Sequence, residues 1–148
     1  MNAKVFVGFT TRDTKWLETV KSFLFPGGTT DVDAWDFQKI DPAGEGPCEI
    51  ERAIAGSSCS LLLISQNFLE LRFVSSQAIG KIVELSRKGH RVLWLPISQS
   101  TVMATDLGHL QAVWDPNKPL VSLSRPKREK ALCEIAKILD GFTKADLQ

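Results

Sequence analysis

The segment Cys59 to Ile64 constrains the fold of this chain most, because it is almost wholly apolar and its polar and apolar residues do not alternate. A strand that packs through one face alternates with a period of two residues, whereas a strand covered on both faces does not. Helices usually cover both faces of a parallel sheet. We therefore predict that this segment is the central strand of a parallel sheet.

Four further segments have the composition of short strands. Between them, apolar residues recur at intervals of three and four, which predicts amphipathic helices. The stretch from Ser98 to Lys118 is polar and turn-rich, and we expect a loop with a short helix there. The predicted strands are Lys4 to Phe9, Val32 to Trp35, Arg91 to Ile97 and Leu120 to Leu123.

The predicted helices begin and end at residues that favour helix ends. The first helix ends at Pro26-Gly27-Gly28, and the second begins at Pro47. The third is capped by Ser75 or Ser76 and stops at Lys88-Gly89. The last helix starts at Ser124 with Pro126 and ends before Gly141.

Strands and helices that alternate along the chain predict an α/β fold with right-handed crossovers and helices on both faces of the sheet. We expect a flavodoxin-like three-layer sandwich with five parallel strands in the order 2-1-3-4-5. Ligands of such sheets bind beyond the carboxyl ends of the strands, where the strand order reverses. That point brings together Phe9 to Asp13, the loop after Trp35, and the residues from Ser65 onward.

Length and charge limit the possible functions. The 148 residues fit one domain, which we assign to 1–142, with 143–148 as a tail or the start of a linker. The net charge is +1 and there is no long Lys/Arg block, which disfavours binding to nucleic acid or a membrane surface. No apolar run approaches the length of a membrane span. The three cysteines form no CxxC pair, so we expect buried thiols and a cytoplasmic location.

Several common sites are disfavoured. His90 and His109 have no Cys or carboxylate partners at ligand spacing, so no metal site is expected. The glycines form neither a GxGxxG nor a GxxxxGK[ST] motif, which disfavours Rossmann and P-loop nucleotide binding. We expect no cofactor.

Two stretches resemble the Toll/interleukin-1 receptor (TIR) domain, in its bacterial NAD-cleaving type. Trp35-Asp36 followed by a Pro/Gly loop and then Glu49-Ile-Glu-Arg-Ala-Ile54 resembles the second strand, the BB loop and the next helix of that family. Leu61 to Val74 resembles the segment from the third strand through Ser-x-x-Phe to an aromatic residue. With Val5 to Phe9 as the first strand, the resemblance covers roughly Lys4 to Leu139.

The resemblance implies an NAD⁺ glycohydrolase, with NAD⁺ as substrate. The family's catalytic Glu lies nine residues after the Phe of Ser-x-x-Phe and four after the next aromatic, and both counts reach Gln77. Cleavage of the nicotinamide–ribose bond builds positive charge on the ribosyl carbon, which a carboxylate stabilises and an amide does not. Gln77 is either a deliberate inactivating replacement or the native residue of a non-catalytic member. We expect this chain to be inactive or weakly active.

Glu84 is an alternative position for the catalytic carboxylate. It lies seven residues beyond Gln77, which along a helix returns to the same face but about 10 Å further down the axis. We interpret it as a solvent-exposed or salt-bridged surface residue.

The resemblance also implies a set of substrate-binding residues, each with a structural alternative. Asp13 is a possible helix cap, Arg12 a possible partner for a pyrophosphate, and Phe73 either a ribose contact or a core aromatic. In the loop Phe37 to Gly46, Pro42 and Gly44 are also ordinary turn residues. The candidate substrate-binding residues are Phe9, Thr10, Thr11, Arg12, Trp35, Asp36, Ile40 and Phe73.

Three function hypotheses follow. The first is an NAD⁺ hydrolase, the effector of a bacterial antiviral or abortive-infection system, activated when a fused or separate sensor domain assembles TIR domains through the BB loop, Phe37 to Gly46. The second is a non-enzymatic TIR module that signals through homotypic contacts, which a native Gln77 favours. The third is a receiver-like regulatory domain. Such a domain needs a cluster of acidic residues at the strand ends, and only Asp13 and Asp36 are found there.

Overall fold

The computed structural model describes residues 3–26 and 30–147, and the predicted Gly27-Gly28 helix stop lies outside these ranges. Within them, five parallel strands form one sheet in the order β2-β1-β3-β4-β5, as predicted. β3 is buried along its whole length at the centre of the sheet, which confirms the interpretation of its apolar run. The strands are β1 (Ala3–Phe9), β2 (Thr30–Asp36), β3 (Cys59–Ile64), β4 (Val92–Pro96) and β5 (Gln111–Ala112).

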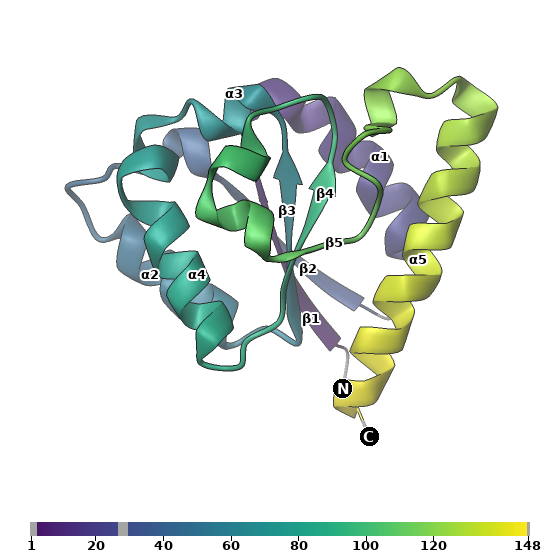
Figure 1. Cartoon of the computed structure of the whole chain (residues 1–148). Coiled ribbons are helices and arrows are strands. Elements are labelled where there is room, and N and C mark those ends of the chain that lie inside the picture. The colour runs from purple at the N-terminus through teal and green to yellow at the C-terminus, as the bar shows by residue number, and fades with distance from the viewer. Residues whose placement is uncertain (1–2, 27–29, 148) are drawn as a thin grey trace.

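Helices cover both faces of this sheet (Figure 1). Alternate strand residues pack on opposite sides: Leu61 and Leu63 face α1 and α5, whereas Leu62 and Ile64 face α2, α3 and α4. The chain is therefore a three-layer α/β sandwich. The helices are α1 (Thr14–Leu24), α2 (Gly46–Ala55), α3 (Gln66–Leu69), α4 (Ile79–Arg87) and α5 (Arg125–Leu147).

The last strand was predicted at the wrong place. β5 consists of Gln111 and Ala112, which pair with Leu93 and Trp94 of β4. The segment predicted as that strand, Leu120 to Leu123, instead contains a 3-10 turn over Leu120–Ser122. Leu120 is fully buried in the core. The apolar run thus contains one buried residue, Leu120, which packs in the core with residues of α5, whereas Val121 is 52% exposed.

Two helix ends also differ from the prediction. Ser75 and Ser76 lie inside a single π-helical turn, η4 (Val74–Ala78), which continues into α4, and their hydroxyls donate to the carbonyl of Arg72 and cap no helix. α5 continues past Gly141 to Leu147, so most of the predicted tail is helical. Pro47, by contrast, lies in the first turn of α2 as predicted.

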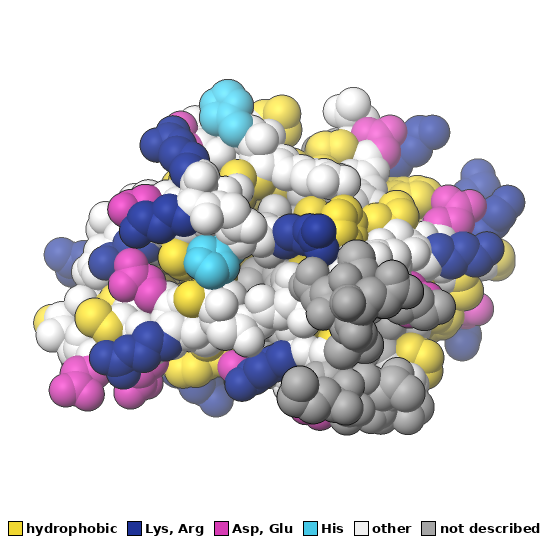
Figure 2. Space-filling model, turned by 90° about the horizontal axis from the view of Figure 1, so that it is seen from below, with side chains coloured by type: hydrophobic (Ala, Val, Ile, Leu, Met, Phe, Trp, Pro, Cys, Tyr) yellow, Lys and Arg dark blue, Asp and Glu magenta, His cyan; other side chains and the backbone are white. Residues whose placement is uncertain are grey.

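Figure 2 shows the molecule from the side where the strands begin. Basic and acidic side chains are interspersed over this visible face, with no broad field of one charge. The first turns after the strands lie on the opposite side, at the carboxyl edge of the sheet (Figure 1). The candidate site is therefore sought at that edge.

Candidate functional site at the carboxyl edge of the sheet

A small hollow lies where the strand order reverses, beyond the ends of β1 and β3. Its volume is about 200 Å³. Thr10 and Arg12 reach it from the end of β1, as the strand order predicted. The residues that line it are Thr10, Arg12, Gln38, Asn67, Glu70 and Leu71.

Hydrogen bonds tie the end of β1 to the loop after β2. The buried hydroxyl of Thr10 donates to Oε1 of Gln38 at 2.9 Å. The hydroxyl of Thr11 donates to the Asp36 carboxylate, whose other oxygen accepts the backbone N–H of Gln38 at 3.0 Å. Asp36 therefore caps the short 3-10 turn η3 (Phe37–Lys39) and fixes the position at which the loop leaves the sheet.

Arg12 is the cation of the hollow. It is exposed, and its guanidinium donates to Oδ1 of Asn67 at 3.2 Å. Glu70, at the end of α3, is the carboxylate of the hollow. An exposed guanidinium can donate two charge-assisted hydrogen bonds to a phosphate or pyrophosphate group.

Asp13 is buried, with 6% of its surface exposed, whereas its neighbour Arg12 is exposed. It occupies the N-cap position of α1 without a capping hydrogen bond, which differs from the capping alternative. Instead its carboxylate accepts a hydrogen bond from Ser65, whose oxygen in turn caps α3 by accepting the N–H of Phe68. Burial raises the pKa of the Asp13 carboxyl above its usual 3.8, and the Ser65 hydrogen bond opposes this effect.

Phe37 anchors the loop after β2 in the core. It is 1% exposed, and its ring lies 5.2 Å from that of Phe68, 5.6 Å from that of Phe73 and 6.1 Å from that of Phe6. Gly8 permits this packing, because a Cβ there would lie 3.0 Å from the Phe37 ring and 2.9 Å from Leu62. The loop is thus held at its start by an aromatic cluster.

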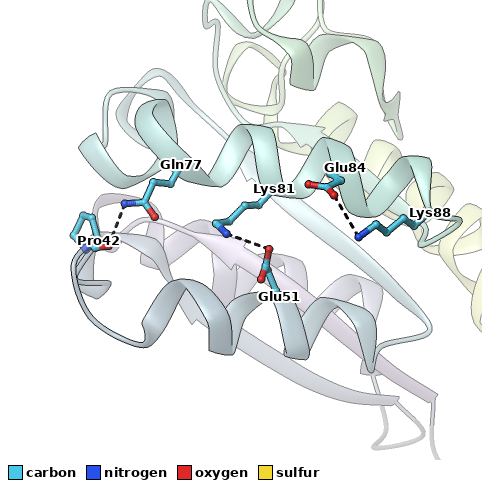
Figure 3. Close-up of polar contacts among 6 residues, drawn as sticks. All are labelled: Pro42, Glu51, Gln77, Lys81, Glu84 and Lys88. Carbon is cyan, nitrogen blue, oxygen red and sulfur yellow. Dashed lines mark hydrogen bonds and ion pairs between the residues drawn. The ribbon is translucent and has the colours of Figure 1, made fainter.

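Gln77 meets the same loop further along. Its side-chain Nε2 donates to the carbonyl oxygen of Pro42 at 3.1 Å, and the side chain is half-buried (Figure 3). Gln77 does not line the hollow. The loop after β2 nevertheless connects it to the hollow, because Gln38 of this loop is hydrogen-bonded to Thr10 and Pro42 of the same loop is hydrogen-bonded to Gln77.

Glu84 lies away from this loop. It pairs with Lys88 of its own helix at 3.3 Å, and its side chain is 64% exposed. One turn after Gln77, Lys81 reaches across to Glu51 of α2 at 3.3 Å (Figure 3). Glu84 is thus the exposed, ion-paired residue that the sequence predicted.

Six of the predicted substrate contacts do not line the hollow. Two of them, Thr11 and Asp36, are joined by the hydrogen bond described above, and the other four pack in or against the core. Phe73 is 4% exposed in the aromatic cluster, and Phe9 is 7% exposed in the core on the α1 and α5 side of the sheet. Trp35 is half-buried and stacks on Phe6 with 6.4 Å between ring centroids. Ile40 packs against the core on the α2 side. All four side chains therefore make packing contacts in or against the core.

Sequence reasoning missed four residues of the hollow. Asn67 and Glu70 follow the third strand, and that position was their only signal. Gln38 and Leu71 gave no signal, because their roles depend on how the loop folds back. The missed residues are Gln38, Asn67, Glu70 and Leu71.

Comparison with known proteins supports the architecture. The chain has a flavodoxin-like α/β fold. It superposes on FerB, a flavoenzyme NAD(P)H:(acceptor) oxidoreductase from Paracoccus denitrificans, with a TM-score of 0.60 and 13% identity over 96% of both chains. The TIR domains of the activated Roq1 resistosome, which recognises the pathogen effector XopQ, match with a TM-score of 0.46 and 19% identity over 93% of this chain and 85% of theirs. No protein family and no curated protein matches the sequence.

Two kinds of feature are absent from residues 3–26 and 30–147. No helix in these ranges is both long and apolar enough to cross a bilayer. No three His, Cys, Asp or Glu side chains in the same ranges are grouped so that they could hold a metal ion.

Proposed function

We propose that this chain is a TIR-type module that binds NAD⁺ at the carboxyl edge of its sheet and cleaves it weakly or not at all. The observation that carries the proposal is the hydrogen bond from Gln77 to Pro42. The module acts by assembling with other TIR domains through the loop 37–46, as the effector of a bacterial defence system that a sensor domain activates. Support comes from the order of the TIR-like motifs and from the flavodoxin-like fold.

The partner of Gln77 supports a non-catalytic role at this position. Pro42 offers a backbone carbonyl, which accepts a hydrogen bond and cannot donate one. An amide N–H₂ satisfies this oxygen, whereas a carboxylate would face it with like partial charge. The side chain that suits chemistry is thus not the one that suits this contact, and this difference supports a non-catalytic role for position 77.

The hollow supports nucleotide binding. Arg12 is exposed there, and although Nη1 donates to Asn67, its guanidinium has further N–H groups that can donate to a pyrophosphate. Glu70 is the acidic residue of the lining of the same hollow. Because Glu70 is a carboxylate, it is the residue of the hollow that could carry any residual cleavage.

A measurement of nicotinamide release tests the proposal. The chain is fused to an oligomeric scaffold, clustering is confirmed by light scattering, and release from NAD⁺ is followed by chromatography. We expect Gln77→Glu to raise the rate by about 10²-fold or more, the scale of a gained charge-stabilising or acid–base group. Glu84→Gln, at an exposed ion pair, is the matched control and should leave the rate unchanged.

Three outcomes contradict parts of the proposal. If the unaltered chain already releases nicotinamide as fast as Gln77→Glu, position 77 is not limiting. If Gln77→Glu releases none while clustered, the hydrolase relationship fails. If NAD⁺ binding measured by calorimetry is the same in Arg12→Ala as in the unaltered chain, the hollow is not the binding site.

A further inference from the structure

A second and larger hollow lies beside the first turns of α5, on residues that the proposed function does not use. Its volume is about 550 Å³, within the range of small-molecule sites. It lies between α5 and the segment that leads into that helix, whereas the loop 37–46 protrudes near α2 on the other side of the molecule (Figure 1). The residues that line it are Trp114, Lys118, Ser122, Leu123, Lys127, Lys130, Ala131 and Glu134.

Trp114 gives this hollow a fixed flat wall. Its indole N–H donates to the carbonyl oxygen of Lys118 at 2.8 Å, and its ring packs against the core on the α5 side. The ring is half-buried, so part of it stays accessible. Leu123 and Ala131 extend the apolar surface. Such a wall favours stacking with an aromatic ring.

Three ammonium groups surround that wall. Lys127 and Lys130 are three residues apart, which places them on one face of α5, and Lys118 joins them from the preceding loop. All three are exposed, and none has an ion-pair partner among residues 3–26 and 30–147. Glu134 is the opposing carboxylate of the lining. Lys127 and Lys130 are already close in the sequence, and folding brings Lys118 beside them.

The helix end adds to the positive potential. The first turn of α5 has no acidic residue, although a helix N-terminus favours negative charge and disfavours Lys and Arg. Arg128 is already committed: it donates to the carbonyls of Leu120 and Leu123 at 3.2 Å and lies over the Trp16 ring at 5.0 Å. Lys127, in the first turn of α5, and Lys130, in the second, therefore remain without an ion pair among residues 3–26 and 30–147.

We propose that this hollow binds a nucleotide-class ligand, an anion that carries phosphate groups and a flat ring. The ring stacks on Trp114, and the phosphates contact Lys118, Lys127 and Lys130. Glu134 accepts a hydrogen bond from a donor on the ring. The combination explains why an aromatic wall, unpaired ammonium groups and a helix N-terminus meet in one place.

Titration with ADP, followed through the tryptophan indole N–H signals in ¹⁵N-correlated NMR spectra, tests the site. The Trp114 signal is assigned from its loss in Trp114→Phe. We expect ADP to shift this signal more than those of Trp16, Trp35 and Trp94. Adenosine and inorganic pyrophosphate, each with half of the recognition elements, should bind at least about tenfold more weakly than ADP.

Matched variants separate this site from its surroundings. The double variant Lys127→Gln and Lys130→Gln should weaken ADP binding at least about tenfold. Lys137→Gln, on the same helix but lining a different hollow, should not change it. In Arg12→Ala, the shift of the Trp114 signal with ADP concentration should stay the same even if ADP no longer binds at the first hollow, which distinguishes this site from the NAD⁺ site. Thermal unfolding checks that each variant is folded.

Other outcomes overturn the proposal. Pyrophosphate binding as tight as that of ADP would make this a plain anion site. Tighter binding of an acidic peptide than of ADP, or a monomerisation caused by the double lysine variant, would make the hollow a protein-docking surface. No shift of the Trp114 signal up to millimolar ADP would leave no nucleotide site.

Discussion

The side-chain Nε2 of Gln77 donates to the carbonyl oxygen of Pro42 at 3.1 Å, and this bond joins the π-helical turn before α4 to the loop after β2. Gln77 lies 35 residues further along the chain than Pro42, so the contact depends on the tertiary fold. The position that the TIR resemblance assigns to chemistry is here a contact with the loop.

Gln77→Glu should therefore destabilise the chain at neutral pH. It removes one hydrogen bond and sets a carboxylate against a carbonyl, a loss of about 0.5–1.5 kcal/mol in the free energy of unfolding. Protonation restores a donor, so the deficit should shrink as the pH falls through the pKa of the introduced carboxyl group. Urea unfolding at several pH values measures this. A deficit that is absent, or that grows in acid, would contradict the hydrogen-bond interpretation.

Gly8→Ala should destabilise the chain by about 1–3 kcal/mol, the usual range for overpacking. Its Cβ would lie 2.9 Å from Leu62 and 3.0 Å from Phe37, both in the buried cluster. Gly80→Ala is the matched control, because its Cβ would meet nothing within 4 Å and alanine favours a helix interior. Chemical denaturation should show a loss for the first and a gain of about 0.5–1 kcal/mol for the second.

Asp13 should make stability depend on pH in a direction opposite to that of most carboxylates. Because burial raises its folded pKa above 3.8, its contribution to stability is fully present below 3.8 and is lost as the pH rises through the folded pKa. Asp13→Asn should therefore gain stability relative to the unaltered chain as the pH rises through that range. Parallel unfolding curves at every pH would refute the raised pKa.

Ser65→Ala extends the same test. The Ser65 hydrogen bond lowers the pKa of Asp13, so its removal should move the carboxyl pKa further upward. A carboxyl ¹³C titration of Asp13 by NMR measures the change directly. A downward movement would mean that another group stabilises the charged form.

Phe73 should behave as a core residue. At 4% exposure in the aromatic cluster, its replacement by alanine should cost about 3–5 kcal/mol of unfolding free energy. Phe73→Leu keeps most of the volume and should affect NAD⁺ binding no more than Phe68→Leu, at a fully buried neighbour. A selective loss of NAD⁺ affinity in Phe73→Leu would support the ribose contact that the resemblance implies.

The sheet was predictable because its signals are local. The run Cys59 to Ile64 predicted a doubly covered strand, and β3 has those bounds. β5 was not predictable, since two residues with one polar side chain carry no periodic pattern. Ser75 and Ser76 suggested caps, but Phe73 and Val74 bury themselves in the core and keep the helical backbone continuous through them.

The candidate site was predictable in outline only. The strand order predicted that Thr10 and Arg12 would meet the residues after β3. The contribution of Gln38 could not be predicted, because it depends on Asp36 capping η3 and on Phe37 entering the core. The positions of Gln38, Asp36 and Phe37 are thus set by tertiary contacts, and residues of these types are common in loops, so the sequence does not single them out.

The buried Phe37 limits how the loop after β2 can move. Pro47, where α2 begins, is buried as well, so the segment between them is fastened at both ends. If this loop opens, only the residues between Phe37 and Pro47 move, and the hydrogen bond from Gln77 to Pro42 holds the loop in its closed position. A neighbouring molecule that displaces this loop has to break the hydrogen bond from Gln77 to Pro42 and move Ile40 away from the core.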